Sequence, residues 1–404
     1  MTPPPFGSKV AQEAAKLLAS GKDPNQIANI LFQRDKAGRN YGIGIILDGH
    51  GRPAKTSKTL QRAATRELKN SGSGSYMNSA KTMAALKDAT LAWQGIPKKY
   101  ADRFHLAVPS DAGTGAVQTA LQSALMLNPK INSLGFETMS WPAYKTLAKV
   151  LGVGIREFPL GAAAKGNSTL PVYQAGPHNS TGRTPQKDEV QARAKAARGW
   201  VVLDRAYSGF EYASQLKSSS YASVMRRSYE TQIKPFIDAG VPFFLAISPT
   251  KAFVTFSLRP CGLLLAFCPD KKTNTAVPGA FNAAIRARGS AFEHPVTRAF
   301  VNAMIHDSKG LQKDHERSLA RLAAAECSWK KLAAGTPLES AFTDQFAGMF
   351  RNIRMREGAQ AALYGKHLYP VFTPGRCRLN VSGLPVNAKA AAVDAKAFSE
   401  FCLD

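Results

Sequence analysis

Lys251 lies in an unusually apolar stretch of the sequence. In "AISPTKAFVTFSLRPCG", residues 246–262, the only other charged residue is Arg259, eight residues further on. Burying an unpaired ammonium group costs several kcal/mol, so a lysine flanked by apolar residues needs either a partner or a covalent bond. We therefore take Lys251 as the first candidate for chemistry.

Other polar and aromatic side chains follow segments that are expected to be strands. Trp141 follows "FETMS", Asn179 follows "VYQAGPH", and Asp204 and Tyr207 follow "WVVL". The segment "FFLAISPT" leads into Lys251 in the same way. Because the carboxyl ends of the strands in an open parallel sheet form the edge where ligands bind, we expect these side chains to lie along one edge.

A glycine-containing loop, "DAGTG", runs into the amphipathic segment "AVQTALQSAL". The backbone N–H groups and the positive end of the dipole at the start of such a helix attract an anion. Alone, a GxG sequence before a helix is more often a simple turn. Together with the edge residues, it predicts a phosphate-binding loop that includes Gly113 and Thr114.

This set of side chains suits pyridoxal 5′-phosphate (PLP). A lysine can form a Schiff base with the cofactor's aldehyde, which removes the cost of burying a free ammonium group. An acid that faces the ring nitrogen keeps it protonated and makes the ring an electron sink. A phenol and an amide can stabilise the ring hydroxyl, an aromatic plate can stack on the ring, and an arginine can bind the phosphate. We therefore predict PLP as the cofactor and no metal site.

Strand-like and helix-like segments alternate through the middle of the chain. "INSLGFETMSW", "VGIREFPL", "WVVLDRAYSGF" and "VPFFLAISPTK" are typical of buried strands. The alternation predicts an α/β fold with three αβα layers and a mostly parallel central sheet. We assign this large PLP-binding domain to residues 50–310. A smaller α+β domain would combine residues 1–49, which are largely helical, with residues 311–404, which include the hairpin-like "VFTPGRCRLNVSGL".

Capping residues predict where three helices begin. Ser57 and Ser79 each precede an amphipathic segment and are predicted N-caps. Thr184 is predicted to cap a third helix, with Pro185 at its first position.

Composition limits the class of protein. The chain has 404 residues with 44% hydrophobic and 20% charged content, which is ordinary for a globular protein and excludes disorder of the whole chain. We find neither an apolar run of roughly 18 residues or more, as a membrane helix needs, nor a secretory signal, so the mature protein is expected to be the whole chain. The five cysteines are scattered without CxxC spacing, which favours free thiols and a cytoplasmic location.

The net charge of +25 is the one unusual feature of the composition. Alone, it favours a polyanionic partner. The basic residues are dispersed in pairs such as Lys98-Lys99 and Arg226-Arg227, however, and no nucleic-acid-binding motif is present. We therefore predict a solvated basic surface, with neither a nucleic acid nor a membrane as partner.

Seven segments, in order along most of the chain, match the motifs of one enzyme family. "FQRDKAGRNYGIGIILDGHGRP" is similar to FxRDxxxxxxNLGVGAYRDxxGxP, and "AGTGAVQTAL" to SGTGALRxGA, with Ala112 in place of serine. "SWPAYKTLAKVLGVGIREFPL" is similar to SWxNHxxIFxxAGxxVxxY, and "HNSTGRTPQ" to HNPTGxDPT. "LDRAYSGF" matches FDxAYQGF, "SPTKAFVTFSLRPCG" matches SxxKNxGLYxERVG, and "GRCRLNVSGL" matches GRxNxxGL. The chain thus resembles the class I aminotransferases of the aspartate and aromatic kind, which are fold-type I PLP enzymes.

The resemblance implies a role for each residue that would contact the cofactor ring. Lys251 would be the Schiff-base lysine and the proton shuttle, and Asp204 would be the partner of the ring nitrogen. Tyr207 and Asn179 would face the ring hydroxyl. Trp141 would stack on the ring, and it would also line the substrate pocket with Asn179.

The resemblance also implies how the phosphate and the substrate are bound. The residues that would hold the phosphate are Gly113, Thr114, Ser248 and Arg259, joined by Tyr76 from the other subunit of a homodimer. Matching the R-x-N-x-x-G-L frame selects Arg378, rather than Arg376, to bind the α-carboxylate of the substrate. Gly44 would line the same pocket.

The implied activity is the transfer of an amino group between an L-amino acid and a 2-oxo acid by ping-pong kinetics. In aspartate-type members an arginine from the neighbouring subunit pairs with the substrate's side-chain carboxylate. The matching stretch here, "AAIRARGSAFEHPVTRAF", has Gly289 at that position, with Arg288 one residue before it. We predict an aromatic or broad substrate range. Aspartate aminotransferase, a PLP-dependent lyase or decarboxylase, and a cofactor-binding protein without catalysis are alternatives.

Overall fold

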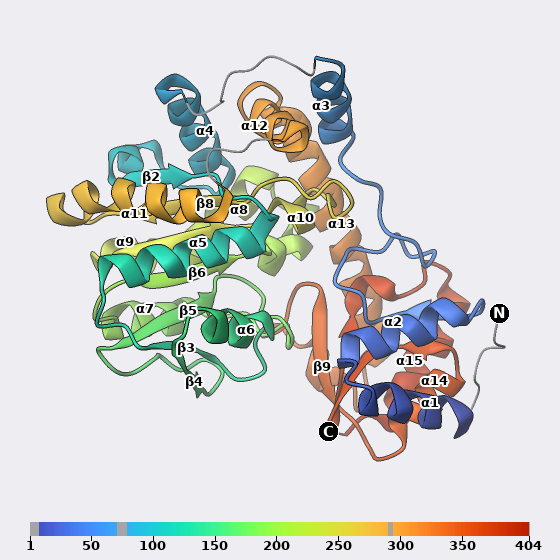
Figure 1. The fold of residues 1–404 in the computed structure, drawn as a ribbon. Helices are drawn as coiled ribbons and strands as arrows, with labels where there is room; N and C mark the ends of the chain where they lie inside the picture. Colours follow the sequence, from blue (N-terminus) through green and yellow to red (C-terminus); the bar gives the residue numbers. More distant parts are fainter. Residues whose placement is uncertain (1–7, 71–78, 290–293, 404) are drawn as a thin grey trace. The chain divides into compact units, whose positions relative to one another are not determined.

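The computed structural model describes residues 8–70, 79–289 and 294–403. The chain divides into two compact units. Unit 1 takes the residues up to Ala54, the segment Pro177–Thr184 and the residues from Ala320 onward, whereas unit 2 takes Lys55–Gly176 and Pro185–Leu319. Each unit contains its own β-structure (Figure 1).

Unit 2 contains a seven-stranded sheet with the strand order β2-β8-β7-β6-β5-β3-β4. Its strands are β2 (Phe104–Ala107), β3 (Ser133–Glu137), β4 (Gly154–Phe158), β5 (Thr169–Gln174), β6 (Val201–Arg205), β7 (Phe243–Ile247) and β8 (Leu263–Phe267). Only β8 runs antiparallel to its neighbours, β2 and β7. The prediction of a mostly parallel central sheet is therefore confirmed.

One strand differs from the expected burial. β4 was expected to be buried, but four of its five residues are exposed. Its position at the edge of the sheet explains why its Arg156 and Glu157 can face solvent.

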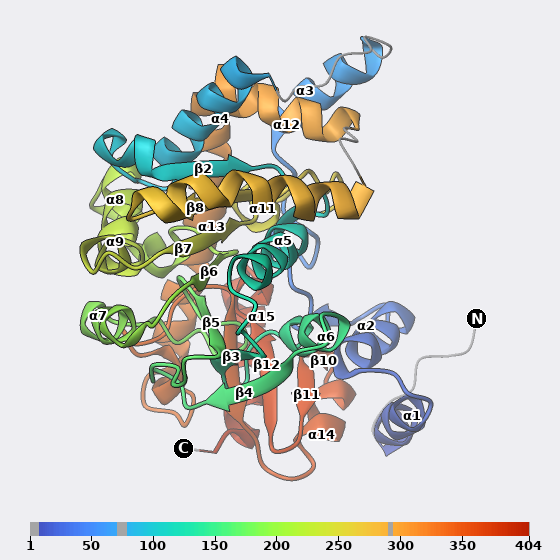
Figure 2. The same ribbon diagram turned by 60° about the vertical axis from the view of Figure 1, so that its left-hand side comes forward.

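Helices cover both faces of this sheet (Figure 2). Val202 and Phe244 belong to a hydrophobic cluster with α5 (Ala112–Leu127), α6 (Ala143–Val150) and α11 (Lys271–Gly289). Their sequence neighbours Val201 and Phe243 point to the opposite face. The helices that pack there are α3 (Lys58–Lys69), α4 (Ala80–Trp93), α7 (Lys187–Ala196), α8 (Tyr221–Gln232), α9 (Lys234–Asp238) and α12 (Pro295–His306). The predicted three-layer αβα fold is confirmed.

Unit 1 combines helices with two small sheets. β1 (Arg39–Asn40) pairs in parallel with β10 (Leu368–Tyr369). β11 (Val371–Thr373), β12 (Arg376–Asn380) and β9 (Phe350–Arg354) form an antiparallel sheet, in which β11 and β12 are the predicted hairpin. The helices are α1 (Ser8–Ala19), α2 (Pro24–Arg34), α14 (Ala359–Gly365) and α15 (Ala388–Phe401). The long helix α13 (Ser308–Ala333) continues from unit 2 into unit 1 along the chain.

Two of the three predicted helix starts agree with the structure. The Oγ of Ser57 accepts a hydrogen bond from the backbone N–H of Leu60 at 3.0 Å, and the Oγ of Ser79 accepts one from Thr82 at 3.2 Å. The prediction for Thr184 is wrong, because α7 begins at Lys187 with Gln186 as its N-cap.

The reason for the late start of α7 lies in unit 1. The backbone N–H of Thr184 donates to the carbonyl of Gln345 at 2.9 Å, and Arg183 forms a β-bridge with Phe346. These contacts hold the segment in an extended conformation, so the helix cannot begin until the chain has left it.

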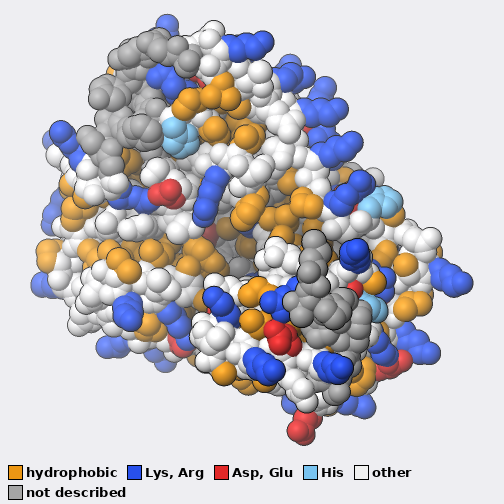
Figure 3. Space-filling view, turned by 45° about the vertical axis from the view of Figure 1, so that its right-hand side comes forward, with side chains coloured by type: hydrophobic (Ala, Val, Ile, Leu, Met, Phe, Trp, Pro, Cys, Tyr) orange, Lys and Arg blue, Asp and Glu red, His pale blue; other side chains and the backbone are white. Residues whose placement is uncertain are grey.

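The surface carries the basic charge in a dispersed form. Figure 3 shows Lys and Arg side chains spread over the face in view, between hydrophobic and uncharged side chains. All five cysteines are free, and four of them are buried. Within residues 8–70, 79–289 and 294–403, no helix is both long and apolar enough to cross a membrane.

Candidate active site

The strands β6 and β7 bring three of the predicted cofactor residues to one edge of the unit 2 sheet. Asp204 near the end of β6 pairs in register with Ala246 of β7. The short helix α10 (Pro249–Ala252), which follows β7, carries Lys251. The charge of Lys251 acts on the Asp204 carboxylate, and Tyr207 lies in the turn after β6. Asp204, Tyr207 and Lys251 therefore belong to one edge, as predicted from the strand ends.

Asp204 has an environment that makes its ionisation sensitive to what binds beside it. Burial raises the pKa of this carboxyl group to about 6, whereas the hydroxyl of Tyr144, the backbone N–H of Ala206 and the charge of Lys251 lower it. Tyr144 donates to Oδ2 at 2.6 Å, and Ala206 donates to Oδ1 at 3.1 Å. A cationic N–H group placed against this carboxylate would favour its ionised form.

Lys251 is held by a local cap and is only partly buried. Ser248 is the N-cap of α10 and accepts a hydrogen bond from the N–H of Thr250 at 3.3 Å, and Pro249 occupies the first helical position. The Nζ of Lys251 lies 5.7 Å from the centre of the Phe256 ring. The apolar surroundings predicted for Lys251 are found in the two residues that follow it, because Ala252 and Phe253 are fully or almost fully buried.

The loop before α5 packs closely against the loop that carries Ser248. A Cβ atom added to Gly113 would lie 2.6 Å from the Cβ of Ser248, so only glycine allows this approach. Thr114 lies in the same first turn, and Asp111, the N-cap residue, makes no side-chain capping bond. The start of α5 therefore lies close to Ser248, and its N–H groups are not capped by the Asp111 side chain, as a phosphate-binding loop requires.

Strained backbone is concentrated in the loops around this edge. Among the described residues, six that are not glycine have positive φ angles, and the one outside unit 2 is His367. The other five are Asp111 (65°), Ala112 (52°), Met139 (59°), Val254 (48°) and Arg259 (42°). Each lies in a segment predicted to surround the cofactor. Such conformations persist only where the surroundings enforce them, and they are common at functional sites.

Trp141 and Arg259 complete the part of the predicted site that lies in unit 2. Trp141 is partly buried and meets Tyr144 edge to face, with ring centres 5.5 Å apart. Arg259 is exposed, and its backbone N–H donates to the carbonyl of Thr255 at 2.7 Å. Trp141 is thus connected through Tyr144 to Asp204.

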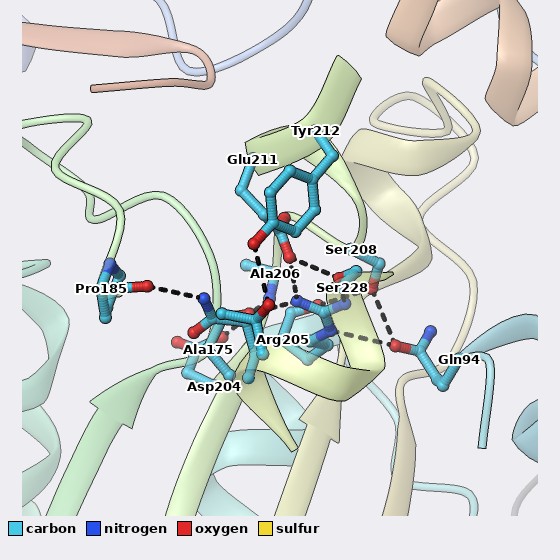
Figure 4. Close-up of polar contacts among 12 residues, drawn as sticks. Gln94, Ala175, Pro185, Asp204, Arg205, Ala206, Ser208, Glu211, Tyr212 and Ser228 are labelled. Atoms are coloured by element: carbon cyan, nitrogen blue, oxygen red, sulfur yellow. Dashed lines mark hydrogen bonds and ion pairs between the residues drawn. The ribbon is translucent and has the colours of Figure 1, made fainter. Parts of the chain in front are cut away.

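A buried polar network supports the turn that holds Tyr207 (Figure 4). Arg205, the residue after Asp204, has no exposed surface and forms an ion pair with Glu211 at 3.1 Å. Its guanidinium group also donates to Gln94, Ser228 and the carbonyl of Ala175. The turn after β6 is therefore fixed at both ends by the same arginine.

Three further predicted residues, Arg378, Gly44 and Asn179, belong to unit 1. An Nη of Arg378 donates to Oδ1 of Asn25 at 2.7 Å and to the carbonyl of Gly42 at 2.8 Å, and its guanidinium carbon lies 4.4 Å from the centre of the Phe350 ring. Asn380 donates to the carbonyls on either side of Gly44, those of Ile43 and Ile45.

Asn179 is buried in the segment Pro177–Thr184. This segment is closed by a hydrogen bond from the N–H of Gly182 to the carbonyl of His178, and it is joined to residue 347 by the N–H of Ala347. Tyr76 lies outside the described residues.

Three residues that contact or support predicted site residues were missed from the sequence. Tyr144 binds Asp204, Asn25 binds Arg378, and Arg205 organises the turn after β6. Tyr144 had a signal, because it stands where the SWxNHxxIF motif has histidine. Asn25 had none, since its partner Arg378 is distant in the sequence. Arg205 had none either, because its bond to Gln94 is long-range and nothing local shows that its pair with Glu211 is buried.

The chain belongs to the class I and II aminotransferase family. The family model described as "Aminotransferase class I and II" matches residues 42–385. The resemblance inferred from the motifs is therefore confirmed. The predicted class of enzyme is confirmed as well: the chain is a PLP-dependent aminotransferase, whose substrates are amino acids and oxo acids. No curated protein matches the chain in sequence.

Solved structures of aminotransferases share the fold. An aromatic-amino-acid aminotransferase from Burkholderia pseudomallei, covalently bound to pyridoxal phosphate, is 20% identical with a TM-score of 0.76, over 94% of this chain and 96% of that one. A cytoplasmic aspartate aminotransferase from Giardia lamblia is 18% identical with a TM-score of 0.73, over 94% and 95%. A broad-specificity aminotransferase from Leishmania mexicana is also 18% identical, with a TM-score of 0.71 over 94% and 95%. At these identities the comparison concerns the fold.

Proposed function

We propose that this aminotransferase acts on L-amino acids with aromatic side chains, or on a broad range of them, and that Lys251 moves the proton of the substrate's Cα. The observation that carries the proposal is the electrostatic pair of Lys251 with the buried Asp204, beside the close contact of Gly113 with Ser248. Lysine, a buried acid and a close-packed helix start are the groups that PLP requires, so the residues fit the cofactor.

When bound, PLP would be joined to Lys251 and would accept the electron pair left at the substrate's Cα. Asp204 would hold the proton on the ring nitrogen, and Tyr207 and Asn179 would donate to the ring hydroxyl. With PLP bound, the Nζ of Lys251 would be the base that takes the proton from the substrate's Cα and the acid that returns it.

The phosphate and the substrate carboxylate would be bound by separate groups. Those for the phosphate are Gly113, Thr114, Ser248 and Arg259. Arg378 would bind the α-carboxylate through paired hydrogen bonds. Gly44, Asn179 and Trp141 would also contact the substrate. The ring of Phe350 and the side chain of Asn25 support the plane of Arg378.

The contacts of Arg288 favour a substrate without a side-chain carboxylate. One Nη of Arg288 lies 2.7 Å from the carboxylate of Asp111, and the other donates to the carbonyl of Gly115 at 2.8 Å and to Thr119 at 3.2 Å. The guanidinium group is thus already bound to the start of α5 in its own chain. A second carboxylate would have to displace Asp111, which costs affinity for dicarboxylic substrates.

A panel of amino donors with 2-oxoglutarate as acceptor tests the substrate range. We expect kcat/KM for phenylalanine or tyrosine to exceed that for aspartate at least tenfold. A difference of this order is expected when the side-chain carboxylate of a substrate enters a site that has no cation to pair with it. Activity with aspartate and none with aromatic donors would overturn the substrate proposal. Release of pyruvate and ammonia without an acceptor would identify a lyase instead.

Replacing Lys251 with alanine tests the proton transfer. The Lys251→Ala variant should retain non-covalently bound cofactor, detected by absorbance, and should lose turnover with every donor. Retained turnover would contradict the assignment of Lys251.

We also propose a cytoplasmic homodimer in which Tyr76 reaches the phosphate of the other subunit. The family resemblance and the free thiols support this proposal. Sedimentation should give a dimer. Mixing inactive Lys251→Ala subunits with weakened Tyr76→Phe subunits should raise activity above that of either alone, because one site of each mixed dimer is then intact. Failure of mixed dimers to gain activity would contradict the shared site.

A further inference from the structure

Tyr144 makes a direct hydrogen bond to the buried acid of the site. Its hydroxyl donates to Oδ2 of Asp204 at 2.6 Å, and the tyrosine side chain is fully buried. The ring is held by Phe136 and Trp141, each with its ring centre 5.5 Å away. The phenol therefore reaches Asp204 from a fixed position on α6 rather than by chance contact of a mobile side chain.

Two other buried tyrosine–aspartate pairs in the described residues differ, because a basic side chain is also bonded to the aspartate. Tyr369 donates to Asp35 at 2.7 Å, but the same carboxylate oxygen also binds His367. Tyr41 donates to Asp394 at 2.6 Å, and that carboxylate forms an ion pair with Arg39. In both cases a basic side chain is bonded to the acid.

The hydrogen bonds to Asp204 from Tyr144 and from the backbone of Ala206 both come from uncharged donors. Lys251 acts on it electrostatically, and the titratable groups that act on Tyr144 are Asp204, Tyr207 and Glu137. Burial and the neighbouring negative charge raise the pKa of Tyr144 well above its ordinary value, so the phenol stays neutral at every physiological pH.

We propose that Tyr144 is a positioning residue that aims and ionises Asp204 toward the ring nitrogen of the cofactor. One oxygen of the carboxylate is fixed by the phenol, and because the phenol is neutral the negative charge remains for the protonated ring nitrogen. At the same motif position a histidine can take up a proton and share that charge. The inference rests on the proposed role of Asp204.

Tyr144→Phe removes the hydroxyl and keeps the ring packing. The ligand for the test is pyridoxamine 5′-phosphate, which cannot bond covalently to Lys251, titrated into cofactor-free protein and followed by its fluorescence. We expect its Kd to rise about tenfold or more, the size expected for a lost hydrogen bond to a charged group. As pH falls, binding should weaken from a higher pH in the variant, because Asp204 takes up its proton more readily without the phenol.

Three comparisons separate positioning from a structural role. An analogue with carbon in place of the ring nitrogen should bind Tyr144→Phe and the natural chain alike. Tyr144→His should recover affinity for pyridoxamine phosphate near pH 8, because the imidazole can donate one N–H to Asp204. Tyr369→Phe, which removes the equivalent hydroxyl from Asp35, should lower the Tm without changing the Kd.

Three results would overturn the inference. If Tyr144→Phe lowers only the Tm, or weakens the carbon analogue as much as pyridoxamine phosphate, Tyr144 acts on the fold and not through the ring nitrogen. If Asp204→Asn leaves the Kd of pyridoxamine phosphate unchanged, the proposed role of Asp204 fails and the inference fails with it. If Asp204→Asn raises the Kd of pyridoxamine phosphate and Tyr144→Phe leaves it unchanged, the inference about Tyr144 is refuted and the proposed role of Asp204 stands.

Discussion

Replacing Glu211 with glutamine would leave the Arg205 guanidinium group buried without a charged partner. Neither side chain has exposed surface, and the two charged groups are 3.1 Å apart. Breaking such a pair costs about 3–5 kcal/mol, because an uncompensated charge remains in a low-dielectric interior. Glutamine can still accept the hydrogen bond from Arg205, so we expect the lower end of this range, about 3 kcal/mol.

The loss can be measured by urea unfolding of the cofactor-free protein, followed by tryptophan fluorescence. Glu137→Gln, in the buried pair with Arg193, should cost a similar amount. Asp238→Asn, in the exposed pair with Lys234, should change the free energy of unfolding by less than about 0.5 kcal/mol. A loss below about 1 kcal/mol for Glu211→Gln would refute the assumption that this arginine depends on its carboxylate partner.

Three further predictions follow from the site. Gly262→Ala would put a Cβ 2.3 Å from the carbonyl oxygen of Ala112, so PLP should bind more weakly, whereas Gly279→Ala meets nothing within 4 Å and should leave the Kd unchanged. Asn25→Ala should raise KM for every amino donor by about threefold to tenfold with little change in kcat, since it loosens the carboxylate-binding arginine. Burial raises the pKa of Asp204 from 3.8 to about 6, so the folded protein holds a proton there that the unfolded chain releases. Above pH 6 the ionised acid therefore lowers the free energy of unfolding. Cofactor-free Asp204→Asn should be more stable than the natural chain at pH 8 by roughly 2–3 kcal/mol, and this difference should disappear near pH 4. Equal urea midpoints of the two proteins at pH 8 would contradict this prediction.

The sequence predicts the sheet edge well because strand ends are a local signal. Asp204 and Lys251 could be assigned to one edge since each follows an apolar segment, and parallel strands end on the same side. Ser57 and Ser79 were recognised as caps for the same reason, because a cap bonds to the N–H three residues later.

Contacts that depend on distant segments could not be predicted. The start of α7 moved to Lys187 because Thr184 pairs with residue 345, a partner that no local pattern indicates. Part of the network around Arg205 is equally non-local, because Arg205 donates to Gln94, which follows α4, and to Ser228 of α8. Its charge is compensated by Glu211, only six residues later, but no local pattern indicates that this pair is buried. The exposure of β4 follows from its place at the edge, which depends on the strand order.

Some groups at the sheet edge of unit 2 lower the stability of the fold, and others raise it. A buried acid and five strained non-glycine residues lower the stability of the edge, whereas the Arg205–Glu211 pair and the close contact of Gly113 with Ser248 hold it in place. If these are one system, Glu211→Gln should weaken both folding and PLP binding, because the turn that carries Tyr207 loses its anchor. Tyr144→Phe should instead weaken binding far more than folding, because it changes the direction and charge of Asp204 and leaves the turn intact. The ratio of these two losses therefore distinguishes a residue that supports the edge from one that tunes the acid.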